Sequence, residues 1–409
     1  MNREETLLRT LAWEYACAAN NEKNMQARTL HTAVNDLKMI RPVVLIEEIP
    51  FHELNFDGSL TLLCEDPDLR GAEDWFRRQL FKWKYFPADM ILPPYFPVQK
   101  IMHSTGIGIT VEEHTIATEA ENHIISHEYF DQLAEPEDLE KLTPPVISYD
   151  KEETMRRYEK LANVFGDILP VRVVGHSSYI TMWDEIARYR GVTPLLMDLI
   201  ERPEHSHAIV SKLAEFEKSK SAQMEALGLF EIQPLEIHCT SALTSDLPGE
   251  YDGGIVKRSQ VWGRGMAQIF GSVSKDMHEE FDINYMKEIM EPFGLVYYGC
   301  CEPLDKKVDI VEKIPHLRKI SITPWADVDN AAEVIGKRYV IANKPNPALV
   351  ATATLDEDAV RQTIKRTLDA CKRNGCSVDI VLKDISTVSH NVQNLIRFEQ
   401  IAMELVRGY

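Results

Sequence analysis

The stretch "GLVYYGCCEPLDKK", residues 294–307, carries the pattern that decides the fold. Its apolar run "LVYY" stops at Gly299 and is followed at once by Cys300, Cys301 and Glu302. A short apolar, aromatic and β-branched run bounded by glycines is typical of a buried strand. The two thiols and the carboxylate would then lie just beyond its carboxyl end.

Short apolar runs of this kind occur eight times, with longer segments of helical periodicity between them, such as residues 193–227 and 356–375. Strand–helix alternation implies a parallel sheet, and eight units predict a (β/α)8 barrel, an α/β fold. The competing architecture is a doubly wound open sheet, but no G-x-G-x-x-G follows the first run. The eight runs span residues 42–49, 88–92, 170–175, 234–239, 294–299, 318–323, 338–343 and 377–384.

Three segments depart from a minimal barrel. The pattern of residues 1–40 predicts a helical extension that precedes the barrel of residues 41–409. We expect the extension and the barrel to form a single domain. Residues 95–145 contain "IGITVEEHTIATEAENHIISHEYF", whose alternating pattern predicts a hairpin inserted after the second run. Residues 252–272, with glycines on both sides of a basic and aromatic patch, predict a long mobile loop over the site.

Composition excludes several classes of function. The formal net charge is -19 and no basic run occurs, which argues against nucleic-acid binding. No run approaches the roughly 20 apolar residues that span a bilayer. The charged, amphipathic N-terminus lacks the apolar core of a signal peptide, so we expect a cytoplasmic location. The seven cysteines, an odd number spread through the chain, do not suggest a disulfide framework.

The sharpest group of candidate ligands joins the fourth and fifth runs, neighbours roughly 5 Å apart in a barrel. His238 and Cys239 end the fourth run, and Cys300, Cys301 and Glu302 follow the fifth. Zinc prefers three or four nitrogen and sulfur ligands and leaves one position open where it is catalytic. The alternatives are that the cysteines are small buried apolar residues, or that the adjacent pair forms a strained disulfide.

Active sites of barrels lie at the carboxyl ends of the strands, and further candidates stand there. We expect Glu47 to be a general base, unless it or its neighbour Glu48 points outward. His176 would orient a substrate or be a hydrogen-bonded core residue. Lys383 with Asp384 would be an ion pair or an anion-binding group. The remaining candidates are Asp327 as a catalytic group, and Arg264, Asn343 and Lys344 for binding the substrate, its carboxylates above all.

The chain also resembles the uroporphyrinogen decarboxylase superfamily, which includes cobalamin-dependent methyltransferases acting on thiols. "MNREETLLRTLAWEY" is similar to the opening helix of this family, and "FDINYMKEIMEPFG" to the helix before the fifth strand. "LVYYGCCEPLD" stands where the methyltransferases carry a strand that ends in an H-x-C-G pattern. "KISITPWADVDNAAEVIGKRYVIANKPNPALV" resembles the sixth strand, the sixth helix and the segment on the seventh strand.

Two departures narrow what the resemblance implies. The decarboxylases carry an arginine-rich motif near the first strand, whereas this chain reads "VVLIEEIPFHELNFDGS", which would repel a porphyrinogen with its many carboxylates. The zinc cysteine of the methyltransferases falls on Cys300, but the zinc histidine falls on Tyr298. His238 or Cys301 would have to replace that histidine. The family's later cysteine falls near Asp384, which would supply an oxygen ligand.

The resemblance therefore implies a methyltransferase that uses zinc, a small-molecule substrate and a separate corrinoid protein, with a homodimer left open. The alternative enzyme is a decarboxylase that acts without metal on a small carboxylic acid, with Asp327, Lys344 or Lys383 stabilising a protonated intermediate. A third reading is a corrinoid- or metabolite-binding barrel without catalysis.

Overall fold

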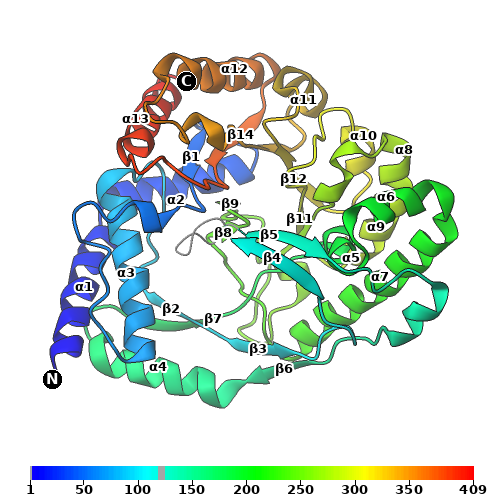
Figure 1. Cartoon of the computed structure of the whole chain (residues 1–409). Coiled ribbons are helices and arrows are strands. Elements are labelled where there is room, and N and C mark those ends of the chain that lie inside the picture. The colour runs from blue at the N-terminus through cyan, green and yellow to red at the C-terminus, as the bar shows by residue number, and fades with distance from the viewer. Residues whose placement is uncertain (1, 118–124) are drawn as a thin grey trace.

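The structure, a computed structural model, describes residues 2–117 and 125–409. It is an α/β protein with a parallel sheet and N-terminal helices (Figure 1). Six parallel strands lie side by side in one sheet, and most of their residues are buried. In spatial order they are β1 (Val43–Ile46), β14 (Ser377–Leu382), β13 (Val340–Asn343), β12 (Leu317–Ile322), β11 (Leu295–Tyr298) and β10 (Trp262–Gly265).

A second parallel ladder joins β2 (Phe96–Gln99) to β7 (Val171–Val174). Isolated parallel bridges connect the chain after β7 to neighbouring segments, from His176 to Phe230 and from Ile180 to Gly265 of β10. Three antiparallel pairs complete the strands of the described residues. They are β3 (Ile101–Ser104) with β6 (Ile147–Asp150), β4 (Glu113–Ala117) with β5 (Ile125–Tyr129), and β8 (Glu236–Ile237) with β9 (Thr240–Ser241).

The helices lie around the outside of the strands (Figure 1). None in the described part of the chain is both long enough and apolar enough to cross a membrane. The α-helices are α1 (Arg3–Ala19), α2 (Glu22–Asn35), α3 (Pro67–Tyr85), α4 (Lys151–Phe165), α5 (Met182–Arg190), α6 (Val192–Glu201), α7 (Pro203–Ala226), α8 (Lys275–His278), α9 (Asn284–Met290), α10 (Val308–Val311), α11 (Val328–Ile335), α12 (Glu357–Asn374) and α13 (Gln393–Arg407), and a π-helical turn, η5 (Glu279–Ile283), links α8 to α9.

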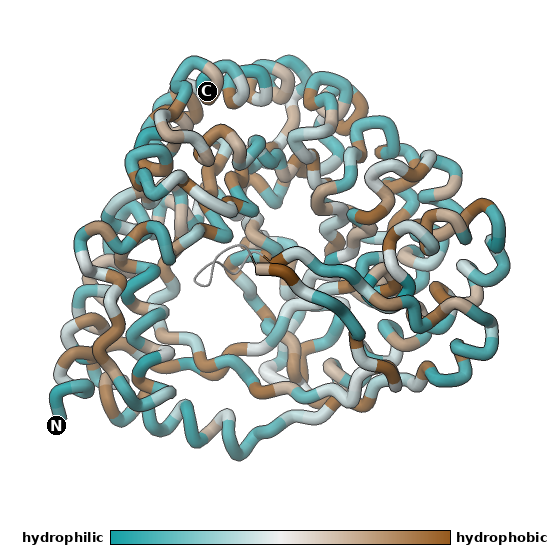
Figure 2. The backbone as a smooth tube through the Cα atoms, in the orientation of Figure 1, coloured by the Kyte–Doolittle hydropathy of each residue, from teal (hydrophilic) through white to brown (hydrophobic). Residues whose placement is uncertain are grey.

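Helix α12 shows how the sequence builds one helix–strand unit. The Asp356 side chain accepts a hydrogen bond from the Ala359 N–H, which caps the first turn. Apolar residues recur at helical spacing among hydrophilic ones (Figure 2), and this apolar stripe is the buried face of the helix. Gly375 ends the helix with a φ of 67°, a left-handed conformation that glycine adopts without steric cost. The chain then turns directly into β14.

Six of the eight predicted runs contain strands of the parallel ladders, and the predicted helical N-terminal segment is present as α1 and α2. The prediction for residues 88–92 is wrong. There the Asn24 side chain of α2 accepts from the Leu92 N–H (2.7 Å) and donates to the Leu92 carbonyl (2.8 Å). A helix side chain thus takes the hydrogen bonds that a strand neighbour would supply, and the strand, β2, forms only after the following prolines.

The predictions for residues 234–239 and 252–272 are also wrong. The first segment contributes only the short hairpin strand β8, which pairs with β9. The second contains the buried strand β10 instead of being a mobile loop throughout. A Cβ on Gly263 would lie 2.8 Å from Met290 of α9 and from the Phe293 ring, and one on Gly265 would lie 2.8 Å from the end of the Met290 side chain, so the helix-facing side of the strand favours glycine. The predicted inserted hairpin is present as β4 and β5, and its tip lies outside the described residues.

The close approach of the chain after β7 to Phe230 gives a stability prediction. A Cβ on Gly175 would lie 2.3 Å from the Phe230 carbonyl carbon and oxygen, so we expect Gly175→Ala to lower the free energy of unfolding by about 1–3 kcal/mol. Gly71, inside α3, has no heavy atom within 4 Å of the place that a Cβ would take, so Gly71→Ala should raise it by about 0.5–1 kcal/mol. Urea unfolding of both variants checks this, and equal stabilities would contradict it.

Candidate functional site

The hairpin turn between β8 and β9 presents two of the predicted ligands. His238 and Cys239 are its two central residues, with φ angles of 47° and 65°. A two-residue turn in which both φ angles are positive is normally built from asparagine and glycine. Placing a histidine and a cysteine there costs backbone free energy, and such strain is concentrated at functional sites. The turn therefore holds these two side chains in place at a cost in stability.

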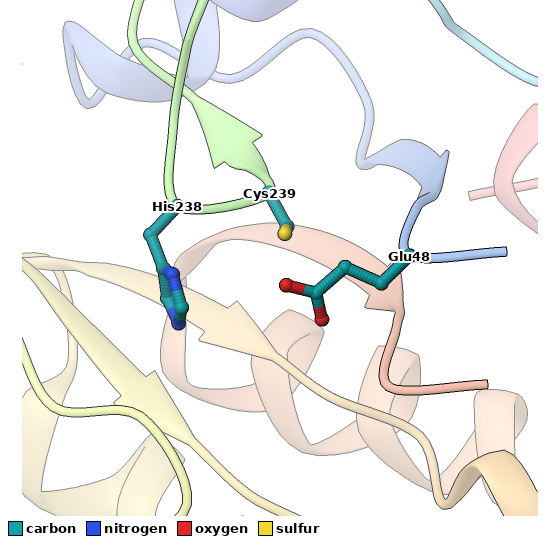
Figure 3. Close-up of side chains that lie close together, drawn as sticks. All are labelled: Glu48, His238 and Cys239. Atoms are coloured by element: carbon teal, nitrogen blue, oxygen red, sulfur yellow. The ribbon is translucent and has the colours of Figure 1, made fainter. Parts of the chain in front are cut away.

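Two acidic residues with the same backbone conformation stand opposite this turn. Glu48, after β1, and Asp384, after β14, have φ angles of 50° and 56°. The Asp384 N–H donates to Glu48 Oε2 at 3.2 Å, which connects the ends of the two strands. One ligand atom each from Glu48, His238 and Cys239 lie within 4.8 Å of one another. In Figure 3 the Cys239 thiol and the Glu48 carboxylate point toward each other beside the imidazole.

The carboxyl end of β11 reaches the same place. Cys300 Sγ lies 3.1 Å from His238 Nε2 and 3.6 Å from Cys301 Sγ. Glu302 Oε2 accepts from the Cys300 N–H at 2.9 Å, and Lys344 Nζ donates to the Cys300 carbonyl at 3.0 Å. Cys300 is thus buried and held at both of its backbone polar groups.

The charge states suit a cluster of metal ligands. The hydrogen bond from the Cys301 thiol, with help from His238 and the Lys344 charge, lowers the pKa of the Cys300 thiol against the effect of burial. Burial lowers the pKa of His238, so the imidazole is neutral at pH 7, the form that binds metals. Burial and the Glu48 charge raise the pKa of Cys239. Cys300 is therefore the first of these thiols to ionise.

Lys383 supplies positive charge within the cluster. Its Nζ lies 3.1 Å from His238 Nε2, 3.2 Å from Glu48 Oε2 and 3.4 Å from Asp384 Oδ2. Burial alone would lower the pKa of Lys383, but the neighbouring anions, Cys300 first among them, raise it above its usual value. The ammonium therefore offsets part of the negative charge of the thiolate and the carboxylates.

The types of these ligand atoms and the distances between them indicate whether a metal ion fits. A neutral imidazole, two cysteines and a carboxylate are the ligand types that zinc prefers. Ligand atoms of Glu48, His238 and Cys239 are close enough for shared coordination, and Cys300 Sγ lies 3.1 Å from His238 Nε2. Asp384 Oδ2, at 3.4 Å, gives the Lys383 ammonium an alternative partner. The ligand types and spacing of Glu48, His238 and Cys239 are those that zinc accepts.

Several predicted site residues lie elsewhere or act differently. Both oxygens of Glu302 are taken by backbone N–H groups, of Cys300 and Ala267, so Glu302 positions Cys300 and is not free as a ligand. Glu47 is bound at both oxygens by Lys82 Nζ at 2.6 and 2.7 Å, and the structure brings its neighbour Glu48 into the cluster instead.

Asp327 caps α11 and pairs with Arg366 on the exposed outer surface, outside the cluster. His176 Nε2 contacts the Lys100 carbonyl at 2.8 Å and lines two cavities of about 430 and 450 Å³. Asn343 is buried, and its Oδ1 accepts from the Thr367 hydroxyl at 3.3 Å.

Tyr298, which stands at the expected position of a ligand histidine, faces the helices. Its hydroxyl donates to Asp282 Oδ2 at 2.5 Å and lies 2.7 Å from His278 Nε2. The alternation of β11 turns Tyr297 toward the opposite side, where its ring lies 5.4 Å from the Arg264 guanidinium. The Tyr298 side chain therefore does not enter the cluster.

Sequence reasoning missed Tyr179, which lies between β7 and α5. Its ring centroid is 5.3 Å from that of His238 and 4.6 Å from the Arg264 guanidinium carbon. No motif surrounds Tyr179 in the sequence, so nothing short of the fold places it at the site.

Comparisons of this chain with known proteins find similarity among solved structures, at low sequence identity. No protein-family model matches it, and neither does any curated protein sequence. Among solved structures, it is similar to a methyltransferase from Methanosarcina mazei, with a TM-score of 0.48 and 11% identity, covering 93% of this chain and 98% of that one. It is also similar to a B12-independent methionine synthase from Shewanella sp. W3-18-1 in complex with selenomethionine, with a TM-score of 0.37 and 11% identity, covering 75% of this chain and 77% of that one.

Proposed function

We propose that this protein is a zinc-dependent methyltransferase that transfers a methyl group between a small substrate and a thiol or a separate corrinoid protein. One observation carries the proposal: ligand atoms of Glu48, His238 and Cys239 lie within 4.8 Å of one another, and Cys300 Sγ lies 3.1 Å from His238 Nε2. Bound zinc would supply Lewis acidity for activating a thiol nucleophile.

The residues of the chain have separate tasks in this proposal. His238 binds as the neutral imidazole and Cys300 as the thiolate. Glu302 and Lys344 hold the backbone N–H and carbonyl of Cys300, which fixes the direction of its thiolate. Lys383 contacts Asp384 as well as His238, so its ammonium would stay paired with Asp384 if zinc were bound at His238.

The wider setting is proposed with it. The parallel strands would belong to a (β/α)8 barrel, with the donor set at the rim formed by their carboxyl ends. The corrinoid partner and a cytoplasmic location rest on the resemblance of the sequence and on its composition. A net charge of -19 suits docking to another protein with a basic face and not to nucleic acid.

Zinc content and methyl transfer test the proposal together. We expect the purified protein to hold about one zinc per chain by mass spectrometry of its metals, and to transfer the methyl group of methylcobalamin to a small thiol. Removing zinc with a chelator should abolish the transfer, and adding zinc back should restore it. Protein that contains no zinc after growth in zinc-supplemented medium would contradict the proposal.

A second candidate function is a decarboxylase that acts without metal. The observation favouring it is that Arg264, Lys344 and Lys383, all buried, lie around Cys300. Three cations would bind the carboxylate of a small acid, and the Lys383 ammonium would supply a proton. Release of CO2 from a small carboxylic acid by zinc-free protein, undiminished by a chelator, would favour this function over methyl transfer.

A further inference from the structure

Arg264 of β10 is a buried cation whose hydrogen-bonding groups are mostly unused. The residue has 0% exposure, and its Nη2 donates to the Gly299 carbonyl at 3.2 Å. Within the described residues, its Nε and Nη1 have no hydrogen-bond partner. A guanidinium pairs with a carboxylate through two parallel N–H groups, one of them on Nη2, and the N–H groups of Nε and Nη1 are free to complete such a pair on a rigid strand.

The surroundings of Arg264 do not compensate for this burial. The rings of Tyr179 and Tyr297 lie 4.6 and 5.4 Å from the guanidinium carbon and attract its charge. Ring faces do not accept the in-plane N–H groups as a carboxylate does. A buried charge that lacks its hydrogen bonds is costly, so a purely structural role leaves this arginine unexplained.

Lys344, beside Arg264, is also a buried cation. Its Nζ donates to the carbonyl of Cys300, the residue after the one that Arg264 contacts, and among the described residues no acidic side chain forms an ion pair with it. Of the five other buried cations among the described residues, Lys307 donates to the Phe270 and Val273 carbonyls, and four have a carboxylate between 2.6 and 3.2 Å away. These pairs are Lys82 with Glu47, Arg190 with Asp198, Lys319 with Asp379, and Lys383 with Glu48.

We propose that Arg264 and Lys344 form a subsite for a carboxylate group of the substrate, beside the Cys300 cluster. In a chain with a net charge of -19, two neighbouring buried cations without a carboxylate partner are complementary to an anion brought by a ligand. Tyr179, about 44% exposed, covers the guanidinium, so the carboxylate enters past this ring. This inference rests on the proposed function and narrows its substrate to a small carboxylic acid that carries the reacting group.

Calorimetric titration with 3-mercaptopropionate and with its neutral amide, 3-mercaptopropionamide, tests the subsite. The wild-type protein should bind the acid at least about tenfold more tightly than the amide, the effect of one charge-assisted hydrogen bond. Because the comparison is made on both zinc-loaded and zinc-free protein, a failure of the zinc proposal leaves the preference for the acid measurable.

Arg264→Gln should lose the preference for the acid, and Lys344→Met should reduce it. Arg172→Gln is the matched control, because Arg172 also lies on a strand and over a tyrosine ring, at 5.0 Å, but its guanidinium already pairs with Glu231. Arg172→Gln should keep the wild-type preference. If Arg264→Gln does not fold, Arg264→Lys, which keeps the charge but loses the fork, should show a reduced preference. Equal binding of acid and amide by the wild-type protein, or an unchanged preference in a folded Arg264 variant, would overturn the proposal.

Discussion

Cys300→Ser is expected to lower the affinity for zinc by more than about a hundredfold, beyond the loss typical of residues that merely orient a ligand. Methyl transfer should fall with it. The reason is that Cys300 is the buried thiol whose pKa is lowered by Cys301 and His238, and its sulfur lies 3.1 Å from the imidazole. Competition for zinc against a coloured chelator measures the affinity.

Cys301→Ser is the matched control, because it changes the adjacent thiol by the same single atom. The Cys300 contact, followed by burial, raises the pKa of Cys301, so its thiol keeps its proton and donates to Cys300. We expect the Cys301→Ser protein to retain zinc with an affinity within about tenfold of the wild type, on the scale of a residue beside the ligands. Equal losses in the two variants would show that the pair acts as a unit and that Cys300 is not the dominant ligand.

Lys319→Met is expected to lower the free energy of unfolding by about 3–5 kcal/mol, because removing one partner of a buried ion pair leaves the other charge uncompensated. Lys319 Nζ lies 2.8 Å from Asp379 Oδ2, and both side chains are fully buried. The ammonium also donates to the Ser241 carbonyl at 2.7 Å and so ties the hairpin of β8 and β9 to the main sheet. Urea unfolding followed by circular dichroism measures the change.

Adding Asp379→Asn to the Lys319 variant removes the stranded charge while keeping the shape of the side chain. The double variant should recover at least about 1 kcal/mol relative to Lys319→Met alone, since partners in one network do not contribute additively. A double variant less stable than Lys319→Met would show that the cost comes from lost packing and not from the unpaired carboxylate.

The sequence predicted most of the strands but not which strands lie side by side in the sheet. The runs around β1, β7 and β11–β14 are visible because buried parallel strands read as continuous apolar runs. Strand β10 was missed because Gly263 and Gly265 give it the composition of a loop, and their necessity appears only when α9 is packed against them. From the sequence, the fourth run, residues 234–239, was expected beside the fifth run, which is β11. The strand that pairs with β11 on that side is β10 instead.

The sequence nevertheless predicted that His238 and Cys300 lie close together, although for a different reason. The expectation relied on adjacent strands, whereas the structure brings His238 in on the tip of a hairpin. The choice between Glu47 and Glu48 could not be made from alternation along β1, because Glu48 has left strand geometry, with a φ of 50°. Likewise, the unused donors of Arg264 depend on which groups surround it and leave no trace in its local sequence.

At the hairpin turn that carries His238 and Cys239, the residues that favour stability differ from those that favour activity. Asparagine and glycine would adopt its two left-handed conformations with less strain, but neither would supply an imidazole or a thiol. Selection for thermal stability alone would therefore be expected to replace this pair, and selection for activity to preserve it. In a directed-evolution experiment, the identity of these two residues would record which of the two pressures was applied.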